Sequence, residues 1–195
     1  HKVNGVADLH TKLLRANMFP DFDRLYPGKF VNMTNGITPR RWLRQANPDL
    51  AALISEAIGD SWVKRQDELV KLAPLADDAA FRERFRAIKR ANKARLADMI
   101  AGRLDMAVDQ DSLFDTQVKR IHEYKRQLLN LFNLITRYNR LREDPDQDML
   151  ARTAIFAGTA APGYDMAKLI LRLINDVADT INHDPAVDDR LQVLF

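Results

Sequence analysis

The segment with the clearest capacity for chemistry is basic: Lys119-Arg120-Ile121-His122-Glu123-Tyr124-Lys125-Arg126. It follows a predicted strand and leads into a predicted helix. Ligands of open α/β sheets bind outside the carboxyl ends of the strands, and a helix N-terminus there favours anions. Arginine offers a planar fork to phosphate oxygens and lysine a compact charge, so the spacing suits one or two phosphate groups of a small molecule. A basic surface edge and a contact to a nucleic-acid backbone also fit this spacing.

Two other segments could contribute to such a site. A second predicted strand is followed by a glycine-containing turn that leads into a helix, Gly158-Thr159-Ala160-Ala161-Pro162-Gly163. This turn should reach the same sheet edge as the basic segment, although a tight structural turn explains the same residues. Asn35, which precedes Gly36, carries an amide that both donates and accepts hydrogen bonds. That amide suits a sugar hydroxyl, and equally a turn.

The composition excludes several classes of functional site. The 195 residues carry 30 Lys+Arg against 27 Asp+Glu, and 46% of them are hydrophobic, which is typical of a globular chain. Because there is no cysteine, disulfides, zinc–thiolate sites and thiol catalysis are excluded. The four histidines lack the spacing of metal ligands, so no metal site is predicted. No apolar run approaches the roughly 20 residues of a membrane helix, so no membrane partner is expected.

A β-α-β-α-β series must position the basic segment. Residues 113–121, 153–157 and 191–195 are predicted strands, and residues 124–141 and 164–181 are predicted helices. Such a series forms a parallel sheet with right-handed crossovers. The first of these helices is expected to bury Leu128, Leu131, Phe132, Ile135, Tyr138 and Leu141. Three parallel strands with one face undercovered make a poor isolated fold, so we expect the chain to be cut from a larger one.

The preceding part of the chain is predicted to consist of helices and loops. Residues 6–18 form a predicted helix and residues 21–30 a loop, while Thr38-Pro39 begins a further helix. Asn47 and Gly59 are expected to cap and end the next helix. A long helix over residues 77–104 should be capped by Asp77 or Asp78. It should pack Phe81, Phe85, Ile88, Leu96 and Met99 on one face and expose Arg82, Arg86, Lys89, Arg90 and Lys93 on the other.

Three long motifs resemble those of the glycogen and maltodextrin phosphorylases: Thr34-Asn-Gly-Ile-Thr-Pro-Arg-Arg-Trp42, Leu113 to Gln127, and Ala160-Ala-Pro-Gly-Tyr164. The matching segments occur in the same order as in the family, along the whole chain. It implies a pyridoxal 5'-phosphate enzyme with two Rossmann-like α/β lobes of the GT-B kind. Such enzymes use inorganic phosphate to cleave the terminal bond of an α-1,4-glucan and release glucose 1-phosphate. The cofactor's phosphate group acts there as proton donor and acceptor.

The resemblance also implies roles for individual residues. Arg120 and Lys125 would hold the substrate phosphate, and Lys119 would lie near the cofactor phosphate. Tyr124 and Asn35 would contact the glucosyl unit. Without the resemblance, Trp42 would be expected in the core, whereas the resemblance places it near the cofactor ring. Two phosphates packed together need several cations, which agrees with the basic segment.

Two departures from the family pattern matter. The family's cofactor-binding lysine lies beyond the position that matches Phe195, so we expect the isolated chain to be inactive. Thr159 stands where the family usually has a lysine, which removes one cation. We therefore predict an internal segment: residues 1–35 close the N-terminal lobe, residues 36–112 form a helical connection, and residues 113–195 open the second lobe. The resemblance further implies a cytoplasmic parent that is commonly a homodimer.

Two other functions remain open on the sequence. The chain could be a non-catalytic domain that keeps an anion or sugar site, in which case it would bind phosphate or glucan alone. It could also bind nucleic acid, with an affinity that falls steeply with salt. Because Tyr124 is the one aromatic residue interleaved with the basic segment, base stacking is disfavoured and no nucleic-acid partner is predicted.

Overall fold

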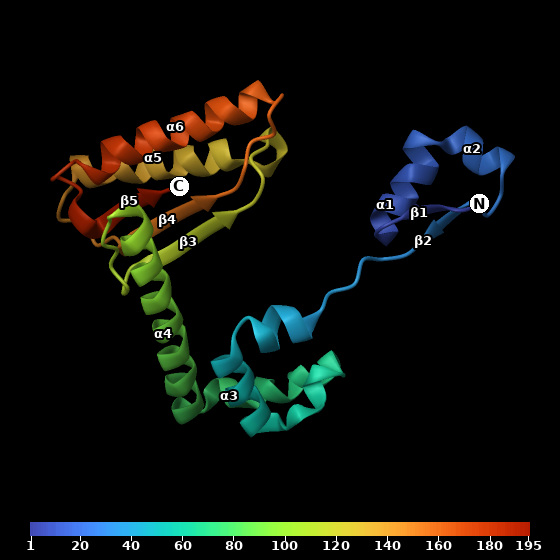
Figure 1. Cartoon of the computed structure of the whole chain (residues 1–195), viewed down its shortest axis with the longest axis horizontal. Coiled ribbons are helices and arrows are strands. Elements are labelled where there is room, and N and C mark those ends of the chain that lie inside the picture. Colours follow the sequence, from blue (N-terminus) through green and yellow to red (C-terminus); the bar gives the residue numbers. More distant parts are fainter. The chain divides into compact units, whose positions relative to one another are not determined.

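The computed structural model describes residues 1–195 and divides them into two compact units, His1–Ile88 and Lys89–Phe195 (Figure 1). Each unit is described by itself. The lobe boundaries predicted at residues 35/36 and 112/113 refer to a larger protein and stay predictions. None of the helices combines the length and the apolar character that a membrane span requires.

The second unit is built around a parallel sheet of three strands in the order β3-β4-β5. The strands are β3 (Leu113–Val118), β4 (Arg152–Ala157) and β5 (Leu191–Leu194). Two helices, α5 (Gln127–Glu143) and α6 (Asp165–Asn182), connect them and lie side by side on one face of the sheet (Figure 1). The predicted β-α-β-α-β series is therefore confirmed, and the unit is an α/β fold compatible with a Rossmann-like sheet.

The core of this unit lies between the sheet and its two helices. Fully buried side chains of β4 and β5 meet a buried stripe on each helix: Ala154, Phe156, Val193, Leu131, Leu134, Leu141, Ile170, Ile174 and Ile181. Burying one such leucine or isoleucine contributes about 1.5–3 kcal/mol. The stripe expected on α5 was partly wrong, because Phe132 is 52% exposed and Leu134 is buried in its place.

The end of helix α4 (Ala79–Leu104) and the residues after it cover part of the opposite sheet face. The ammonium of Lys93 lies 4.7 Å from the centre of the Phe114 ring and donates to the Ser112 carbonyl. The hydroxyl of Ser112 is 2.7 Å from that of Thr153. Asp78 caps α4 as predicted, through a bond from Phe81 N–H. The two predicted faces are only partly right, because Lys93 has contacts, whereas Phe85 and Met99 are exposed.

The first unit begins with two short parallel strands, β1 (Val3–Gly5) and β2 (Phe30–Asn32). Between them lie α1 (Asp8–Leu13), a π-helical turn (Leu14–Met18) and α2 (Pro20–Leu25). The prediction of helices and loops alone was wrong here, because it missed both strands and placed a loop where α2 forms. A run of three residues is too short to show the alternation that marks a strand.

The rest of this unit packs around Trp62, which is fully buried and donates from Nε1 to the Ser55 hydroxyl. Helix α3 (Pro48–Ile58) is capped by the Asn47 side chain and ends at Gly59, whose φ of +79° suits glycine. Both predictions are confirmed. Short helical turns complete the unit: η2 (Arg40–Gln45), η3 (Asp60–Val63) and η4 (Gln66–Asp77). The second unit adds η5 (Glu123–Lys125) and η6 (Asp188–Arg190).

Trp42, expected in the core before the resemblance is considered, is 72% exposed on η2. The predicted helix after Thr38 is confirmed, because Pro39 is already helical and η2 follows it. Its first N–H groups, of Arg41 and Trp42, donate to the Thr38 carbonyl. The buried tryptophan of this unit is thus Trp62, which the sequence prediction did not single out.

Candidate functional site at the carboxyl ends of strands β3 and β4

The basic segment forms a loop, Lys119–Arg126, that leaves the sheet at the carboxyl end of β3; we call it the basic loop. The ladder between β3 and β4 continues into this loop. Lys119 N–H donates to the Ala157 carbonyl at 2.9 Å, and Ile121 N–H donates to the Thr159 carbonyl at 3.1 Å. The glycine-containing turn after β4 therefore lies beside the basic loop, at the edge where open α/β sheets bind ligands.

Gly158 allows this close approach. A Cβ atom at this position would lie 2.0 Å from the carbonyl oxygen of Lys119, which is far inside van der Waals contact. A side chain there would push the turn and the loop apart. The turn predicted from its glycines is thus a structural requirement for bringing the two segments together, whether or not it touches a ligand.

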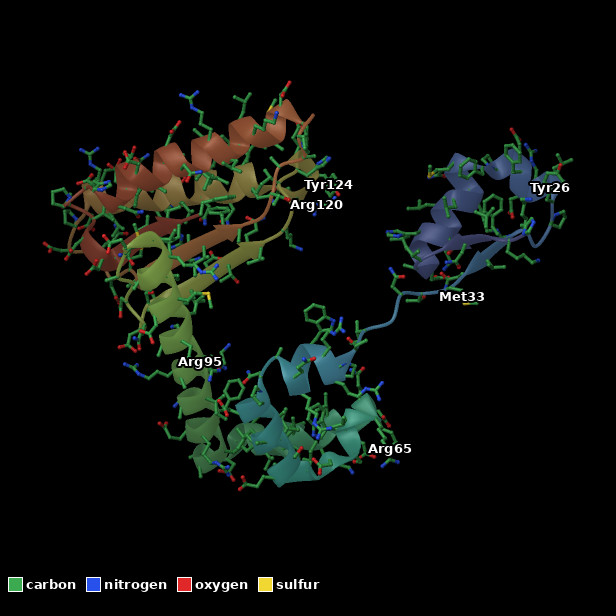
Figure 2. The ribbon with its side chains drawn as sticks, in the orientation of Figure 1. Tyr26, Met33, Arg65, Arg95, Arg120 and Tyr124 are labelled. Atoms are coloured by element: carbon green, nitrogen blue, oxygen red, sulfur yellow. The ribbon has the colours of Figure 1, made fainter.

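The cations of the basic loop have no carboxylate partners. Lys119 and Arg120 are exposed, and neither forms an ion pair. Figure 2 labels Arg120 and Tyr124 at the end of the second unit where β3 ends. Lys125 is half-buried, and its ammonium lies 5.9 Å from the centre of the Tyr124 ring. A group of cations that no acid neutralises is suited to an incoming anion.

The loop places its last two cations, Lys125 and Arg126, directly before α5. His122 is extended, Glu123–Lys125 form one 3₁₀ turn (η5), and Arg126 has a φ of +64° immediately before α5. No acidic side chain lies in the first turn of α5, so its N-terminus remains positive. Asp165 in the first turn of α6, by contrast, offsets the positive end of that helix.

An aromatic and acidic cluster closes the loop against the turn after β4. The Tyr164 hydroxyl donates to Oε2 of Glu123 at 2.5 Å. The centre of the His122 ring lies 4.0 Å from that of Tyr124 and 4.8 Å from that of Tyr164. This hydrogen bond raises the pKa of Tyr164, because it stabilises the neutral hydroxyl beside a carboxylate. Sequence reasoning gave neither Glu123 nor Tyr164 a role, and only their place within the quoted motifs pointed to them.

The other predicted site residues lie on the first unit. Asn35 is exposed in a segment without helix or strand, and its N–H donates to the Val6 carbonyl at 2.9 Å. Trp42 is exposed on η2. The structure therefore groups Lys119, Arg120, Tyr124 and Lys125 in one loop and leaves Asn35 and Trp42 on a separate segment of the chain. Thr159 is exposed beside the loop and adds no charge.

The parallel sheet with its connecting helices makes the second unit an α/β protein of the class that binds ligands at the carboxyl ends of its strands. The family model for carbohydrate phosphorylases matches residues 1–195, so the chain belongs to the carbohydrate phosphorylase family.

Curated relatives agree with this family. A glycogen phosphorylase of Synechocystis is 52% identical over 195 residues, which cover all of this chain and 23% of that protein. The muscle form of glycogen phosphorylase from Homo sapiens is 49% identical over the same length and share. A glycogen phosphorylase of Chlamydia pneumoniae is 47% identical over 194 residues, 24% of its length. The chain thus spans about a quarter of the length of the curated relatives it matches.

Proposed function

We propose that this chain acts as an internal segment of a longer α-glucan phosphorylase of the GT-B kind. That protein would cleave the terminal α-1,4-glucosidic bond of glycogen or maltodextrin with inorganic phosphate and release glucose 1-phosphate. One observation carries the proposal: the basic loop at the carboxyl ends of β3 and β4 holds three cations, Lys119, Arg120 and Lys125, that form no ion pair. The names of the relatives support the reaction. Family resemblance alone supports a cytoplasmic homodimer.

The residue roles follow from charge and shape. Arg120 would hold the substrate phosphate through its planar fork, and Lys125 would add a compact positive charge beside it. Tyr124 and Asn35 would contact the glucosyl unit. In the proposed site these groups bind and orient the phosphate and the sugar. Two adjacent phosphates repel each other, so their approach depends on cations that no protein carboxylate already neutralises.

The donor set also fits the phosphate end of pyridoxal 5'-phosphate. Lys119 is exposed, has no ion pair and follows directly on β3, so it would hold that phosphate, while Trp42 would lie near the ring. When bound, the cofactor supplies a phosphate group that gives and accepts a proton. The lysine that attaches the cofactor in this family is expected outside this sequence, so we propose that the isolated chain is inactive.

Removal of Arg120 tests the phosphate role. In the longer protein, Arg120→Ala should raise the KM for phosphate roughly 10- to 100-fold, because a charge-assisted hydrogen bond contributes about 1.5–3 kcal/mol. The KM for glucan and the unfolding midpoint should stay near their original values. Initial rates of glucose 1-phosphate formation at several phosphate concentrations provide the measurement. Arg140→Ala, an exposed arginine of α5, is the matched control, and unchanged phosphate kinetics in Arg120→Ala would overturn the assignment.

The isolated chain separates this function from the alternative of a non-catalytic binding domain. We expect no glucose 1-phosphate when the 195 residues are incubated with maltodextrin, phosphate and pyridoxal 5'-phosphate. Turnover at the rate of the longer protein would contradict the proposal. Phosphate or glucan binding by the isolated chain, abolished in Lys119→Ala and Arg120→Ala, would instead favour a domain that binds without catalysing.

A further inference from the structure

A buried side-chain amide holds the main chain of the basic loop. Gln127, the first residue of α5, is fully buried. Its Nε2 donates to the carbonyl of Arg120 at 3.1 Å, and its Oε1 faces the N–H of His122 at a longer 3.4 Å. The one amide therefore contacts the backbone on both sides of Ile121, whose side chain is itself buried in the core.

Gln127 occupies a position in the core where a polar side chain needs hydrogen-bond partners. On α5 it is in helical register with the buried residues Leu131 and Leu134, where an apolar side chain would be expected. A buried amide is unfavourable unless it is hydrogen-bonded, and the only partners of this one belong to the basic loop. The side chain thus stabilises the core only when the loop has this conformation.

A second amide pair holds the other end of the loop. Gln117 on β3 donates from Nε2 to the Lys125 carbonyl at 3.0 Å. Asn130 on α5 donates to Oε1 of Gln117 at 3.1 Å, which fixes the orientation of that amide. The carbonyls of Arg120 and Lys125, the two residues that carry the proposed phosphate contacts, are therefore both bound by glutamine side chains.

We propose that Gln127 is a positioning residue, which fixes the main chain at Arg120 so that the guanidinium stays where phosphate binds. Gln117 does the same for Lys125. Neither glutamine touches the phosphate. The consequence for phosphate rests on the proposed function of the basic loop, whereas the hold on the loop backbone does not.

The test compares Gln127→Met with Asn133→Met in the full-length phosphorylase that carries this sequence. Methionine preserves the length of the side chain and removes both hydrogen bonds, and Asn133 is an exposed amide on the same helix. Hydrogen exchange measured by mass spectrometry, without substrates, should become about tenfold faster in the peptide that covers residues 119–126 of Gln127→Met. Peptides from β4 and the Asn133→Met protein should keep the original exchange rates. Unchanged exchange in the loop would overturn the proposal.

Kinetics then separate positioning from folding. Gln127→Met should raise the KM for phosphate about tenfold and leave the KM for glucan nearly unchanged, a split that general destabilisation would not produce. The positioning role is wrong if exchange in the loop becomes faster and Arg120→Ala raises the KM for phosphate, but Gln127→Met leaves that KM unchanged. If Arg120→Ala itself has no effect, the phosphate assignment fails, and exchange alone decides whether Gln127 holds the loop.

A second variant covers the case in which Gln127→Met does not fold. Gln117→Met removes the bond to the Lys125 carbonyl from a half-buried position, where the loss should be tolerated. The same faster exchange in the peptide over residues 119–126 and the same rise in the KM for phosphate are expected. Unchanged values of both would overturn the proposal.

Discussion

Two segments were predicted to carry site residues, and the structure supports them in different ways. The basic loop of the second unit is anchored by the buried Ile121, by backbone bonds to the turn after β4 and by side-chain bonds from Gln127 and Tyr164. The segment from Thr34 to Trp42 has no helix or strand before Pro39. Both Asn35 and Trp42 on it are exposed.

The difference shows how much of each segment's position comes from its own unit. In the basic loop, the hydrophobic core continues to the base of the site, so core packing also places the cations. In the Thr34–Trp42 segment, backbone bonds to Val6 and within the turn at Thr38 provide local contacts, and the aromatic side chain makes no core contact. We therefore expect substitutions of residues that support the basic loop to change stability. Substitutions in the Thr34–Trp42 segment should leave it unchanged.

The two tryptophans of the first unit should give the largest contrast. Trp62→Ala should destabilise the chain by about 3–5 kcal/mol, because a fully buried aromatic ring leaves a cavity. Trp42→Ala should change stability by less than about 0.5 kcal/mol, because its side chain is 72% exposed. Urea unfolding followed by circular dichroism measures both. A comparable loss in Trp42→Ala would mean that the Thr34–Trp42 segment is held as firmly as the core.

Glycines beside the basic loop should give a smaller contrast. Gly158→Ala places a methyl group against the Lys119 carbonyl and should destabilise the second unit by about 1–3 kcal/mol. Gly163→Ala, in the same turn but with no atom within 4 Å of the added Cβ, should stay within about 0.5 kcal/mol of the original. Thermal unfolding of the two variants gives the comparison. Equal stabilities would show that the approach of Gly158 to the loop is not required.

The smallest effect should be on acid sensitivity, through one carboxyl group in each unit. The Tyr138 hydroxyl and the Ala186 N–H donate to Asp184 and lower its pKa, while Arg84 lowers the pKa of Glu56 through a two-bond ion pair. A carboxyl with a lowered pKa stabilises the fold above its unfolded pKa of about 4, and this contribution is lost as the pH falls through the lower folded value. Asp184→Asn and Glu56→Gln should each flatten the fall in stability below about pH 4.

Salt distinguishes these two carboxyls. The Arg84–Glu56 pair is exposed, so added salt should screen its contribution. The donors to Asp184 from Tyr138 and Ala186 are neutral and should respond less. Unfolding midpoints between pH 7 and 3, measured at low and high salt, check both. If salt reduces the acid sensitivity due to Asp184 as strongly as that due to Glu56, the nearby Arg142 would be its main partner instead.

Sequence reasoning predicted the strands and helices of the second unit well and those of the first unit poorly. The second unit has long periodic elements separated by clear turns, and each sheet-edge segment follows a strand. In the first unit, β1 and β2 are three residues long and pair across 25 or more residues, which no local pattern reveals. Around the site, the loop itself was predicted, whereas Gln127 and Tyr164 were not. The helical register of Gln127 with Leu131 and Leu134 was the signal that could have identified Gln127.

The sequence by itself determined the α/β class of the second unit, the order of its elements and the place of the basic loop between a strand and a helix. These features depend on local periodicity and turn residues, which act within a few positions of the chain. Only the tertiary structure decided that Trp62 is buried and Trp42 exposed. It also decided that Gly158 meets the Lys119 carbonyl and that Tyr164 bonds Glu123, 41 positions away. Such contacts depend on which surfaces meet when the core forms, and residues distant in the sequence then share one environment.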